Sequence, residues 1–519
     1  MTQVQTDRKG RLRPYHSEII DVSDLNCAPS PTPIASTVTT SVEPDSEKEQ
    51  AAGLSKSALT LVLLASFMVV LDFSIVNVAL PSIHRALGFG GNSVQWVVTA
   101  YAITFGGLLI LGGRIADTFG RRSLLIAGLL IFAAASLAAG VADDAVLLVV
   151  ARAVQGVGAA IVAPASLSLI TARLGEGPQR TRALGLYGAT ASIGFVAGQV
   201  LGGVLVQYTS WRLIFLVNVP VGIAAAVWAP RLITSVRRSS KSTHLDVTGG
   251  VLITLAVAAG VFAVSEAPVQ GWFDPFVLAA LVVAALAMGS FVAVERVQTA
   301  PLIDLSLLRR RGLRTAAILT FVMGACTAGE LVVLSVYLQQ ALHDSPLAAG
   351  LVIAPQGVVG FMTGMFGARL VGRIGMRALL VAATASMGVG FLILAHLPSS
   401  GHYSPVFFAV VLVGFGVVGT VFGTTVMAAS GMAQSDQGLV GGVVNTTRQV
   451  GAAVGVAALV GIAEGARARA GVATLSGDRT AMTVAALVGF IGTVAAWYGA
   501  RTSAPSDLST STIGERSGH

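Results

Sequence analysis

Charged side chains are scarce in this sequence. Only 11% of its 519 residues are Asp, Glu, Lys or Arg, whereas an average soluble domain carries about 25%. Hydrophobic residues make up 54% of the chain, and the mean hydropathy is +0.78. So few charges cannot cover the surface of an ordinary soluble protein of this length. The composition therefore predicts a polytopic membrane protein whose main partner is the lipid bilayer.

Residues that carry most enzyme and metal chemistry are also few. The two cysteines are Cys27, in a polar tail, and Cys326, in an apolar run, so no disulfide framework is expected. The seven histidines lie in tails or at loop edges, without metal-ligand or catalytic-triad spacing. No Gly-x-x-x-x-Gly-Lys-Ser/Thr phosphate loop occurs. We expect no metal, no cofactor, no ATP-driven step and no enzymatic activity.

The net charge is +8, which in a soluble protein would suggest nucleic-acid binding. Here the basic residues occupy short loops between apolar runs, so they are interpreted as setting orientation in the membrane, with no nucleic-acid partner. One side of the predicted topology holds eighteen Lys and Arg residues and the other side five. The positive-inside rule then places both termini in the cytoplasm and the protein in the cytoplasmic membrane. The loop 464–479, with three Arg outside, is either an ordinary exception or a sign of one miscounted late span.

Long apolar runs are abundant. A helical span needs about 20 apolar residues, and fourteen runs satisfy this requirement. The polar segments 1–57 and 501–519 are predicted to be disordered cytoplasmic tails. The predicted spans are 58–80, 93–112, 124–142, 146–170, 183–207, 212–232, 245–265, 274–294, 314–338, 347–368, 378–396, 405–429, 438–463 and 479–500.

An internal repeat organises these spans. L-G-G-R-I-A-D-T-F-G-R-R-S-L-L at 111–125 aligns with F-G-A-R-L-V-G-R-I-G-M-R-A-L-L at 366–380. Each copy follows the second span of a six-span block, so 58–232 and 314–500 are predicted to be duplicated halves. The segment 233–313 then holds loops and two extra helices. The predicted fold is an all-α membrane protein with two six-helix halves, the organisation of a secondary transporter.

The first copy of this loop, G-G-R-I-A-D-T-F-G-R-R at 112–122, resembles the loop between the second and third spans of the major facilitator superfamily. The resemblance implies a cytoplasmic conformational latch, because an acid beside arginines can pair in one state and separate in another. The alternative is a loop that only sets topology. Gly372 replaces the acid in the second copy, so only the first half carries the full pattern. The latch residues are Gly113, Asp117, Gly120, Arg121 and Arg122.

The fourth span, V-A-R-A-V-Q-G-V-G-A-A at 150–160, resembles the family's R-x-x-Q-G-x-G segment. Arg152 and Gln155 are three residues apart and share one helix face. At a rise of about 1.5 Å per residue, Arg152 and the lone acid Asp72 of the first span both lie about 21 Å from the cytoplasm. Opposite charges buried at one depth are predicted to pair. The alternative is that Arg152 alone extends outward to the membrane surface.

The fifth span, G-A-T-A-S-I-G-F-V-A-G-Q-V-L-G-G at 188–203, resembles the antiporter signature of drug-exporting facilitators. Gly194, Gly198, Gly202 and Gly203 match that signature, and Gln199 replaces its proline. Glycines four residues apart form a smooth stripe that another helix can approach closely. The alternative is a generic packing stripe.

Two further stretches, L-D-F-S-I-V-N-V-A-L-P at 71–81 and Q-W-V-V-T-A-Y at 95–101, resemble the fourteen-span drug:proton antiporter branch of the superfamily. The resemblance covers about 58–500. It implies the facilitator fold, proton-driven export and a cavity between the halves.

Other polar residues at membrane depth are candidate site residues. Glu330 lies about 24 Å from the cytoplasmic side in the ninth span, where it would carry a proton or meet a cationic substrate, or simply be capped by a neighbouring side chain. Arg448 is expected to extend back to the cytoplasm. The alternative is that it lines the second half of the cavity with Asn445 and Gln449. The candidate cavity residues are Tyr101, Gln155, Tyr187, Phe195, Tyr337, Gln356, Asn445 and Gln449.

These patterns together predict a monomeric proton-coupled antiporter that exports small lipophilic drugs, antibiotics or natural products. Asp72, Arg152 and Glu330 are the predicted proton-coupling residues. The alternative is a proton symporter that imports a small organic solute, which would need more polar groups in its cavity. A channel or sensor is the remaining possibility.

Overall fold

Every regular element in the described part of the chain is helical. The computed structural model describes residues 54–174, 178–233, 246–298, 309–396, 403–430, 432, 437–470 and 475–500, and at a few helical positions only their backbone. Most of the predicted tails (1–53 and 501–519) and much of the predicted connecting segment 233–313 lie outside these residues. The elements are α2 (Lys56–Leu87), η1 (Gly91–Gln95), α3 (Trp96–Phe119), α4 (Arg121–Gly140), α5 (Ala145–Arg173), α6 (Pro178–Tyr208), α7 (Leu213–Leu216), α8 (Asn218–Leu232), α9 (Val247–Gln270), α10 (Pro275–Val297), α11 (Arg311–Val336), η3 (Tyr337–Ala341), α12 (Pro346–Ile374), α13 (Met376–Leu394), α14 (Ser404–Ala429), α15 (Gln437–Ala470) and α16 (Ser476–Gly499).

Helices occupy all fourteen predicted runs, and the sixth run is divided at Val217 into α7 and α8. Within the described residues, thirteen helices are long and apolar enough to cross a membrane. The remaining run contains α3, whose described apolar stretch, Ser93–Leu109, is shorter than a span. The fold is therefore that of a multi-pass membrane protein, and the count of fourteen crossings stays a prediction.

Local sequence explains where the helices begin and end. The side chains of Asp144 and Ser345 cap α5 and α12 by accepting from backbone N–H groups of the first turn. In both copies of the repeated loop, a glycine with positive φ forms the turn between two helices. Gly120 separates α3 from α4 at φ 96°, and Gly375 separates α12 from α13 at φ 82°. Only glycine adopts this conformation without strain, so the repeat predicted from sequence is also a structural repeat.

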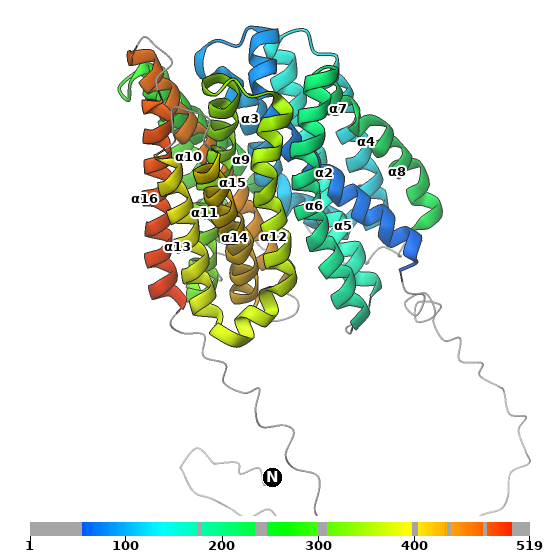
Figure 1. Ribbon diagram of the computed structural model, residues 1–519. Helices are drawn as coiled ribbons and strands as arrows, with labels where there is room; N and C mark the ends of the chain where they lie inside the picture. The colour runs from blue at the N-terminus through cyan, green and yellow to red at the C-terminus, as the bar shows by residue number, and fades with distance from the viewer. Residues whose placement is uncertain are drawn as a thin grey trace, which may run out of the picture. The chain divides into compact units, whose positions relative to one another are not determined.

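The helices form two groups, which are the N-terminal group (α2–α8) and the C-terminal group (α11–α16) (Figure 1). Within the first group α2 packs on α6, and α5 packs on α3 and α4. Two seams join the groups, one between α6 and α12 and the other between α3 and α15. At the end where α2, α4, α11 and α13 begin, the loops carry the clustered arginines, and we call this end the basic end.

Hydrogen bonds join the two groups at the opposite end. Ser335 Oγ of α11 donates to the carbonyl of Asn77 on α2 at 2.8 Å. Gln339 Nε2 donates to the carbonyl of Val78 at 2.9 Å. The seam between α6 and α12 is also tight here, since a Cβ at Gly203 would lie 2.6 Å from Leu347 Cα. The groups therefore meet through backbone-close contacts at this end.

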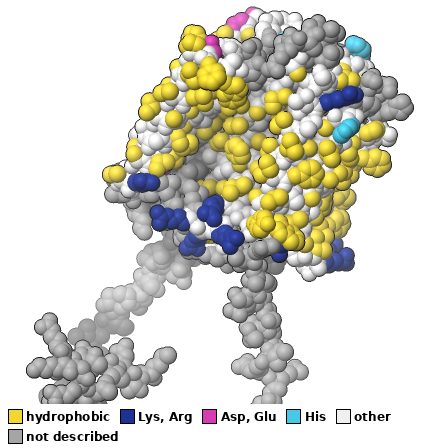
Figure 2. Space-filling model, turned by 90° about the vertical axis from the view of Figure 1, so that its left-hand side faces the viewer, with side chains coloured by type: hydrophobic (Ala, Val, Ile, Leu, Met, Phe, Trp, Pro, Cys, Tyr) yellow, Lys and Arg dark blue, Asp and Glu magenta, His cyan; other side chains and the backbone are white. Residues whose placement is uncertain are grey.

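The hairpin of α9 and α10 is inserted between the two groups in the chain. Its helix α9 packs on α3 and on α15, so it lies along one of the two seams. Part of the contact is apolar and is formed by Ala102, Ile103, Val257, Val261, Ala453 and Ala457. Trp96 of α3 also packs on Phe262 of α9, with ring centroids 6.2 Å apart. Hydrophobic side chains cover most of the face seen in Figure 2, while Lys and Arg gather at its lower edge. This distribution is expected of a lipid-facing surface that is bordered by basic residues, here called the basic rim.

Candidate functional site

Asp72 lies in the middle of α2 and has no solvent exposure. Its carboxylate accepts three hydrogen bonds from two other helices. Arg152 Nη1 donates to Oδ2 at 2.6 Å, and Gln155 Nε2 donates to Oδ1 at 2.7 Å. Asn218 Nδ2 also donates to Oδ1, at 2.8 Å. The acid therefore links α2 to α5 and α8 through donors that are all buried.

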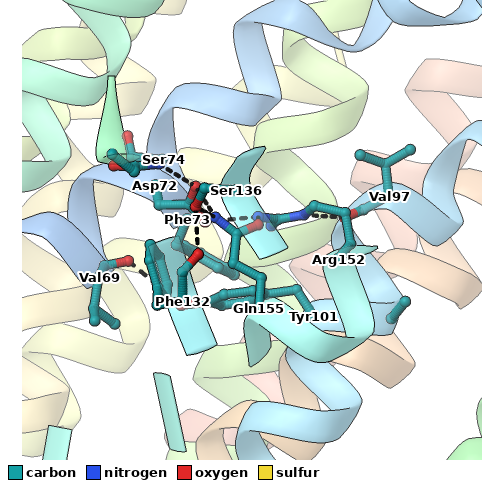
Figure 3. Close-up of polar contacts among 12 residues, drawn as sticks. Val69, Asp72, Phe73, Ser74, Val97, Tyr101, Phe132, Ser136, Arg152 and Gln155 are labelled. Atoms are coloured by element: carbon teal, nitrogen blue, oxygen red, sulfur yellow. Dashed lines mark hydrogen bonds and ion pairs between the residues drawn. The ribbon is translucent and has the colours of Figure 1, made fainter. Parts of the chain in front are cut away.

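Arg152 is also fully buried, and its guanidinium is held from several directions (Figure 3). Its Nε donates to the carbonyl of Val97 on α3 at 2.8 Å. The same Nη1 that binds Asp72 also donates to Gln155 Oε1 at 2.7 Å. The ring of Tyr101 lies 4.4 Å from the guanidinium carbon, close enough for a cation–π contact. The ion pair predicted from the matching depths of the two residues is present, so the alternative of an outward-extending Arg152 is wrong.

The sequence-based reasoning missed two members of this network. Ser136 of α4 accepts from Gln155 Nε2 at 2.8 Å and donates to the carbonyl of Phe132 at 2.7 Å. Asn218 is the first residue of α8. As a lone amide within an apolar run, Asn218 carried the same signal that singled out Asp72.

The network is costly to disrupt because it is dry. A buried ion pair gains little over an apolar core, but removal of one partner leaves a buried charge uncompensated, at a cost of about 3–5 kcal/mol. Side chains or carbonyls from α2, α3, α4, α5 and α8 all take part. A change in the charge of Asp72 must therefore be felt by five helices.

The predicted glycine stripe has two partners. Cβ atoms at Gly194, Gly198 and Gly202 would lie 2.9–3.2 Å from backbone carbonyls of α2. Gly203 faces α12 instead. The stripe thus holds α6 against the helix that carries Asp72, and its last glycine lies in the seam between the groups.

Gln199, which stands where the resembled signature has proline, is fully buried in the unbroken helix α6. Its Nε2 donates to Ser74 Oγ at 3.2 Å. Ser74 Oγ in turn donates to the carbonyl of Phe195 at 2.8 Å. The replacement therefore adds a polar tie between α6 and α2, two residues from Asp72.

The structure places part of the predicted latch. Gly113 lies at the end of α3 against Pro164, and Gly120 forms the turn to α4. Arg122 Nη1 donates to the carbonyl of Ile233 at 3.1 Å, so this arginine binds the end of α8 within its own group. The side chain of Asp117 lies outside the described part of the structure. The role of the latch stays a prediction.

Glu330 of α11 is fully buried like Asp72, but its surroundings are sparse. Gln356 Nε2, from α12, contacts its Oε2 at 3.4 Å. Its Oε1 has no hydrogen-bond partner among the described residues. Gln356, predicted to line a cavity, thus contacts the second acid, and its place in a cavity stays a prediction.

The other predicted cavity residues have different surroundings. Tyr101 and Gln155 belong to the Asp72 network, and Tyr337 is fully buried. Tyr187 donates to the carbonyl of Ala163 at 3.3 Å. Phe195 is partly buried against the apolar core.

Arg448 is held by its own helix. Its Nε and Nη2 donate to Asn445 Oδ1 at 3.1 and 2.5 Å, one turn towards the start of α15. The expected extension of Arg448 to the cytoplasm stays a prediction. Asn445 is about 12 Å along the helix from Gln437 at the usual rise. Gln449, the next residue, is buried against Gly106 of α3.

The fold and the buried charges define the class of this protein. Two groups of apolar helices, related by a repeated loop and joined along two seams, form the framework of a secondary membrane transporter. The Major Facilitator Superfamily family description matches residues 62–456. The chain belongs to the Major Facilitator Superfamily, and it is a multi-pass membrane transporter and not an enzyme.

Relatives and solved structures agree with this assignment. The chain is 37% identical to the cephamycin export protein CmcT of Amycolatopsis lactamdurans, over 76% of this chain and 82% of that protein. It is also 37% identical to the puromycin resistance protein pur8 of Streptomyces alboniger, over 76% and 78% of the two chains. A peptide transporter POT crystallised with sulfate has a TM-score of 0.65 at 15% identity, covering 88% of this chain and 99% of that one. This last likeness concerns the fold alone.

Proposed function

We propose that this protein is a proton-coupled antiporter that exports lipophilic drugs, antibiotics or natural products across the cytoplasmic membrane by alternating access. The observation that carries the proposal is the fully buried Asp72–Arg152 pair in the middle of the N-terminal group. Ionisable groups at this depth are costly and usually belong to ion or proton pathways. The names of the relatives support export of antibiotics, and thereby a role in resistance.

The hydrogen-bond inventory of Asp72 explains how a proton would act. The ionised carboxylate only accepts hydrogen bonds, whereas a protonated carboxyl also carries a donor. Oδ2 accepts only from Arg152, so a proton on this oxygen places an O–H beside the guanidinium. Protonation therefore removes the charge attraction for Arg152 and adds a donor next to it, which weakens this contact. The charged form holds α2 to α5 and α8, and the neutral form releases α2.

A movement of α2 would act directly on the end of the molecule opposite the basic end, where hydrogen bonds join the two groups. Asn77 and Val78, whose carbonyls bind Ser335 and Gln339 of the C-terminal group, follow Asp72 on the same helix by five and six residues. A rotation or shift of α2 would strain these bonds first. In this mechanism, loading of Asp72 with a proton from the outside is linked to rearrangement of the outer contacts.

Glu330 is proposed as a second proton site, in the C-terminal group. Its one long contact, with Gln356, does not fix a charged carboxylate as the three donors fix Asp72. We propose that the segments 58–232 and 314–500 rock against each other within a monomer. The loop with Gly113, Asp117, Gly120, Arg121 and Arg122 is the proposed latch at the cytoplasmic side. Both termini are proposed to be cytoplasmic, which the basic rim in Figure 2 supports.

Everted membrane vesicles with an imposed pH gradient, acidic inside, provide the test. Addition of a transported compound should dissipate the gradient, and the compound should accumulate in the lumen. A panel of antibiotics and dyes, screened for resistance and accumulation in cells, would identify which compound to use. Accumulation that requires the opposite gradient would favour the symporter, and accumulation without any gradient would reject proton coupling.

A further inference from the structure

Arg448 differs from the other deeply placed charged residues. Asp72 and Arg152 neutralise each other, and Glu330 is completely enclosed. Arg448 is only partly buried, and no carboxylate binds it among the described residues. Intramembrane arginines usually pair with an acid or with backbone carbonyls. Arg448 does neither, since its protein partner is the side-chain oxygen of Asn445.

Arg448 lies where α15 packs on helices of both groups. The α15 backbone at Arg448 packs on Gly324 of α11, within the C-terminal group. At the next residue, Gln449, α15 packs on Gly106 of α3, in the N-terminal group. Arg448 therefore belongs to a segment of α15 at the seam between the groups, and the proposed function places the transported compound between these groups.

The geometry leaves donors available. A guanidinium has five N–H groups in a planar fork. Asn445 Oδ1 is occupied by one from Nε and one from Nη2, at 3.1 and 2.5 Å. Asn445 thus fixes one edge of the guanidinium, and both N–H groups of Nη1 and the second N–H of Nη2 remain for another acceptor. Such a fork matches the two oxygens of a carboxylate or a similar oxyanion.

We propose that Arg448, positioned by Asn445, is the binding site for the anionic group of the transported compound. The preferred substrates are then amphiphiles that join an apolar or aromatic body to a carboxylate. The inference rests on the proposed export function and narrows its substrate class.

A matched pair of probes tests the assignment. Dansyl-phenylalanine and its methyl ester differ only in the carboxylate, and their fluorescence reports binding to the purified protein in lipid nanodiscs. The wild-type protein should bind the acid about tenfold more tightly than the ester, a difference of about 1.4 kcal/mol. Equal binding of the two probes by the wild type would overturn the proposal, whether or not any variant folds.

Variants then assign the preference to Arg448. Arg448→Gln should abolish the preference for the acid and leave ester binding within about twofold. Arg448→Lys, which keeps the charge but loses the fork, should retain part of it. The control is Arg231→Gln, which removes an exposed arginine at the end of α8 and should change neither affinity. A preference for the acid that survives in Arg448→Gln would reject the site.

The two proposals fail separately. Probe binding is measured without a pH gradient, so it does not depend on proton coupling. In one outcome, wild-type vesicles transport nothing against a pH gradient while the purified wild-type protein still binds the acid more tightly than the ester. That result rejects export, and the anion site stands. If Arg448→Gln still drives proton-dependent transport of the cationic dye ethidium, its loss of acid binding is specific to the anionic group. Equal loss of ethidium transport and acid binding would instead assign Arg448 to the transport cycle and overturn the substrate-binding role.

Discussion

The side-chain amide of Gln199 and the hydroxyl of Ser74 form a buried hydrogen bond of 3.2 Å between α6 and α2. Ser74 is two residues from Asp72, and its hydroxyl also donates to the carbonyl of Phe195. A proline at position 199 could not form this bond, because it has no side-chain donor. The chain therefore ties the helix of the buried acid to α6 where the resembled signature would introduce a kink.

The direction of this bond yields a first prediction, on stability. Ser74→Ala leaves the buried amide of Gln199 only its long contact of 3.5 Å with the backbone carbonyl of residue 74, and should lower the free energy of unfolding by about 1–3 kcal/mol. Gln199→Leu should cost less, within about 1 kcal/mol, because Ser74 keeps its bond to Phe195. Thermal unfolding of the two purified variants, followed by intrinsic fluorescence, ranks them. An equal or greater loss in Gln199→Leu would contradict the interpretation.

Asp72→Asn should abolish proton-coupled export while the protein still inserts into the membrane. An amide cannot exchange the proton, yet it still offers one oxygen to Arg152. The measurement is drug-dependent dissipation of a pH gradient in everted vesicles, together with the amount of protein in the membrane. Asp143→Asn is a suitable control, because Asp143 is exposed and pairs only with Arg212 at 3.3 Å. Wild-type active transport by Asp72→Asn would exclude Asp72 as the proton carrier.

Arg152 and Asp72 should be energetically coupled. Each single variant, Asp72→Asn or Arg152→Gln, loses the ion pair, and the former leaves a buried guanidinium unpaired, at a cost of about 3–5 kcal/mol. The double variant carries no buried charge at this position, so its loss should be smaller than the sum of the single losses by more than about 1 kcal/mol. Unfolding free energies of the four proteins give this coupling directly.

A companion experiment concerns the pH dependence of transport. Arg152→Ala should change it, because the charge that faces the Asp72 carboxylate is removed. Additive stability losses in the cycle, or an unchanged pH profile in Arg152→Ala, would argue against the pair as the coupling unit.

The glycine stripe predicts a difference between two alanine substitutions on the same helix. A Cβ at Gly198 would lie 2.7 Å from Ser74 Cβ, whereas a Cβ at Gly188 would meet nothing within 4 Å. Gly198→Ala should therefore push α6 away from α2 and cost about 1–3 kcal/mol. Gly188→Ala should be neutral or slightly stabilising, because alanine favours helix over glycine. Equal melting temperatures for the two variants would show that the stripe tolerates a methyl group.

Asp117→Asn tests the proposed latch. If this acid pairs with arginines in only one conformation, its loss should slow the conformational cycle without weakening substrate binding. Turnover in vesicles should fall, and dye affinity in nanodiscs should remain unchanged. Lost affinity with normal turnover would instead place Asp117 in the binding site.

Much of this architecture could be predicted because the sequence directly gives two quantities. These are the hydropathy of each run and the depth of each residue along its helix. The fourteen apolar runs became helices, and the equal depths of Asp72 and Arg152 predicted their contact. The repeated Gly120 and Gly375 marked equivalent turns. These features depend on position along a helix, which a sequence reveals through the helical rise.

Features that depend on rotation about the helix axis could not be predicted. In lipid both faces of a helix can be apolar, so the periodicity that reveals the core face of a soluble helix is weak. For this reason the burial of Tyr337 and the direction of Arg448 could not be inferred. Asn218 faces Asp72 across the contact between α8 and α2, and this facing also depends on rotation about the helix axis.

The α9–α10 hairpin has a mechanical consequence. Its helix α9 touches α3 of one helix group and α15 of the other, along the same seam, through alanine, valine and isoleucine side chains. If the two groups rock, α9 cannot stay fixed to both, so one of these contacts must slide. The contact with α3 includes the packed rings of Trp96 and Phe262, and Gln95 of η1 donates to Ser265 of α9. We therefore expect α9 to move with the N-terminal group and the contact with α15 to slide.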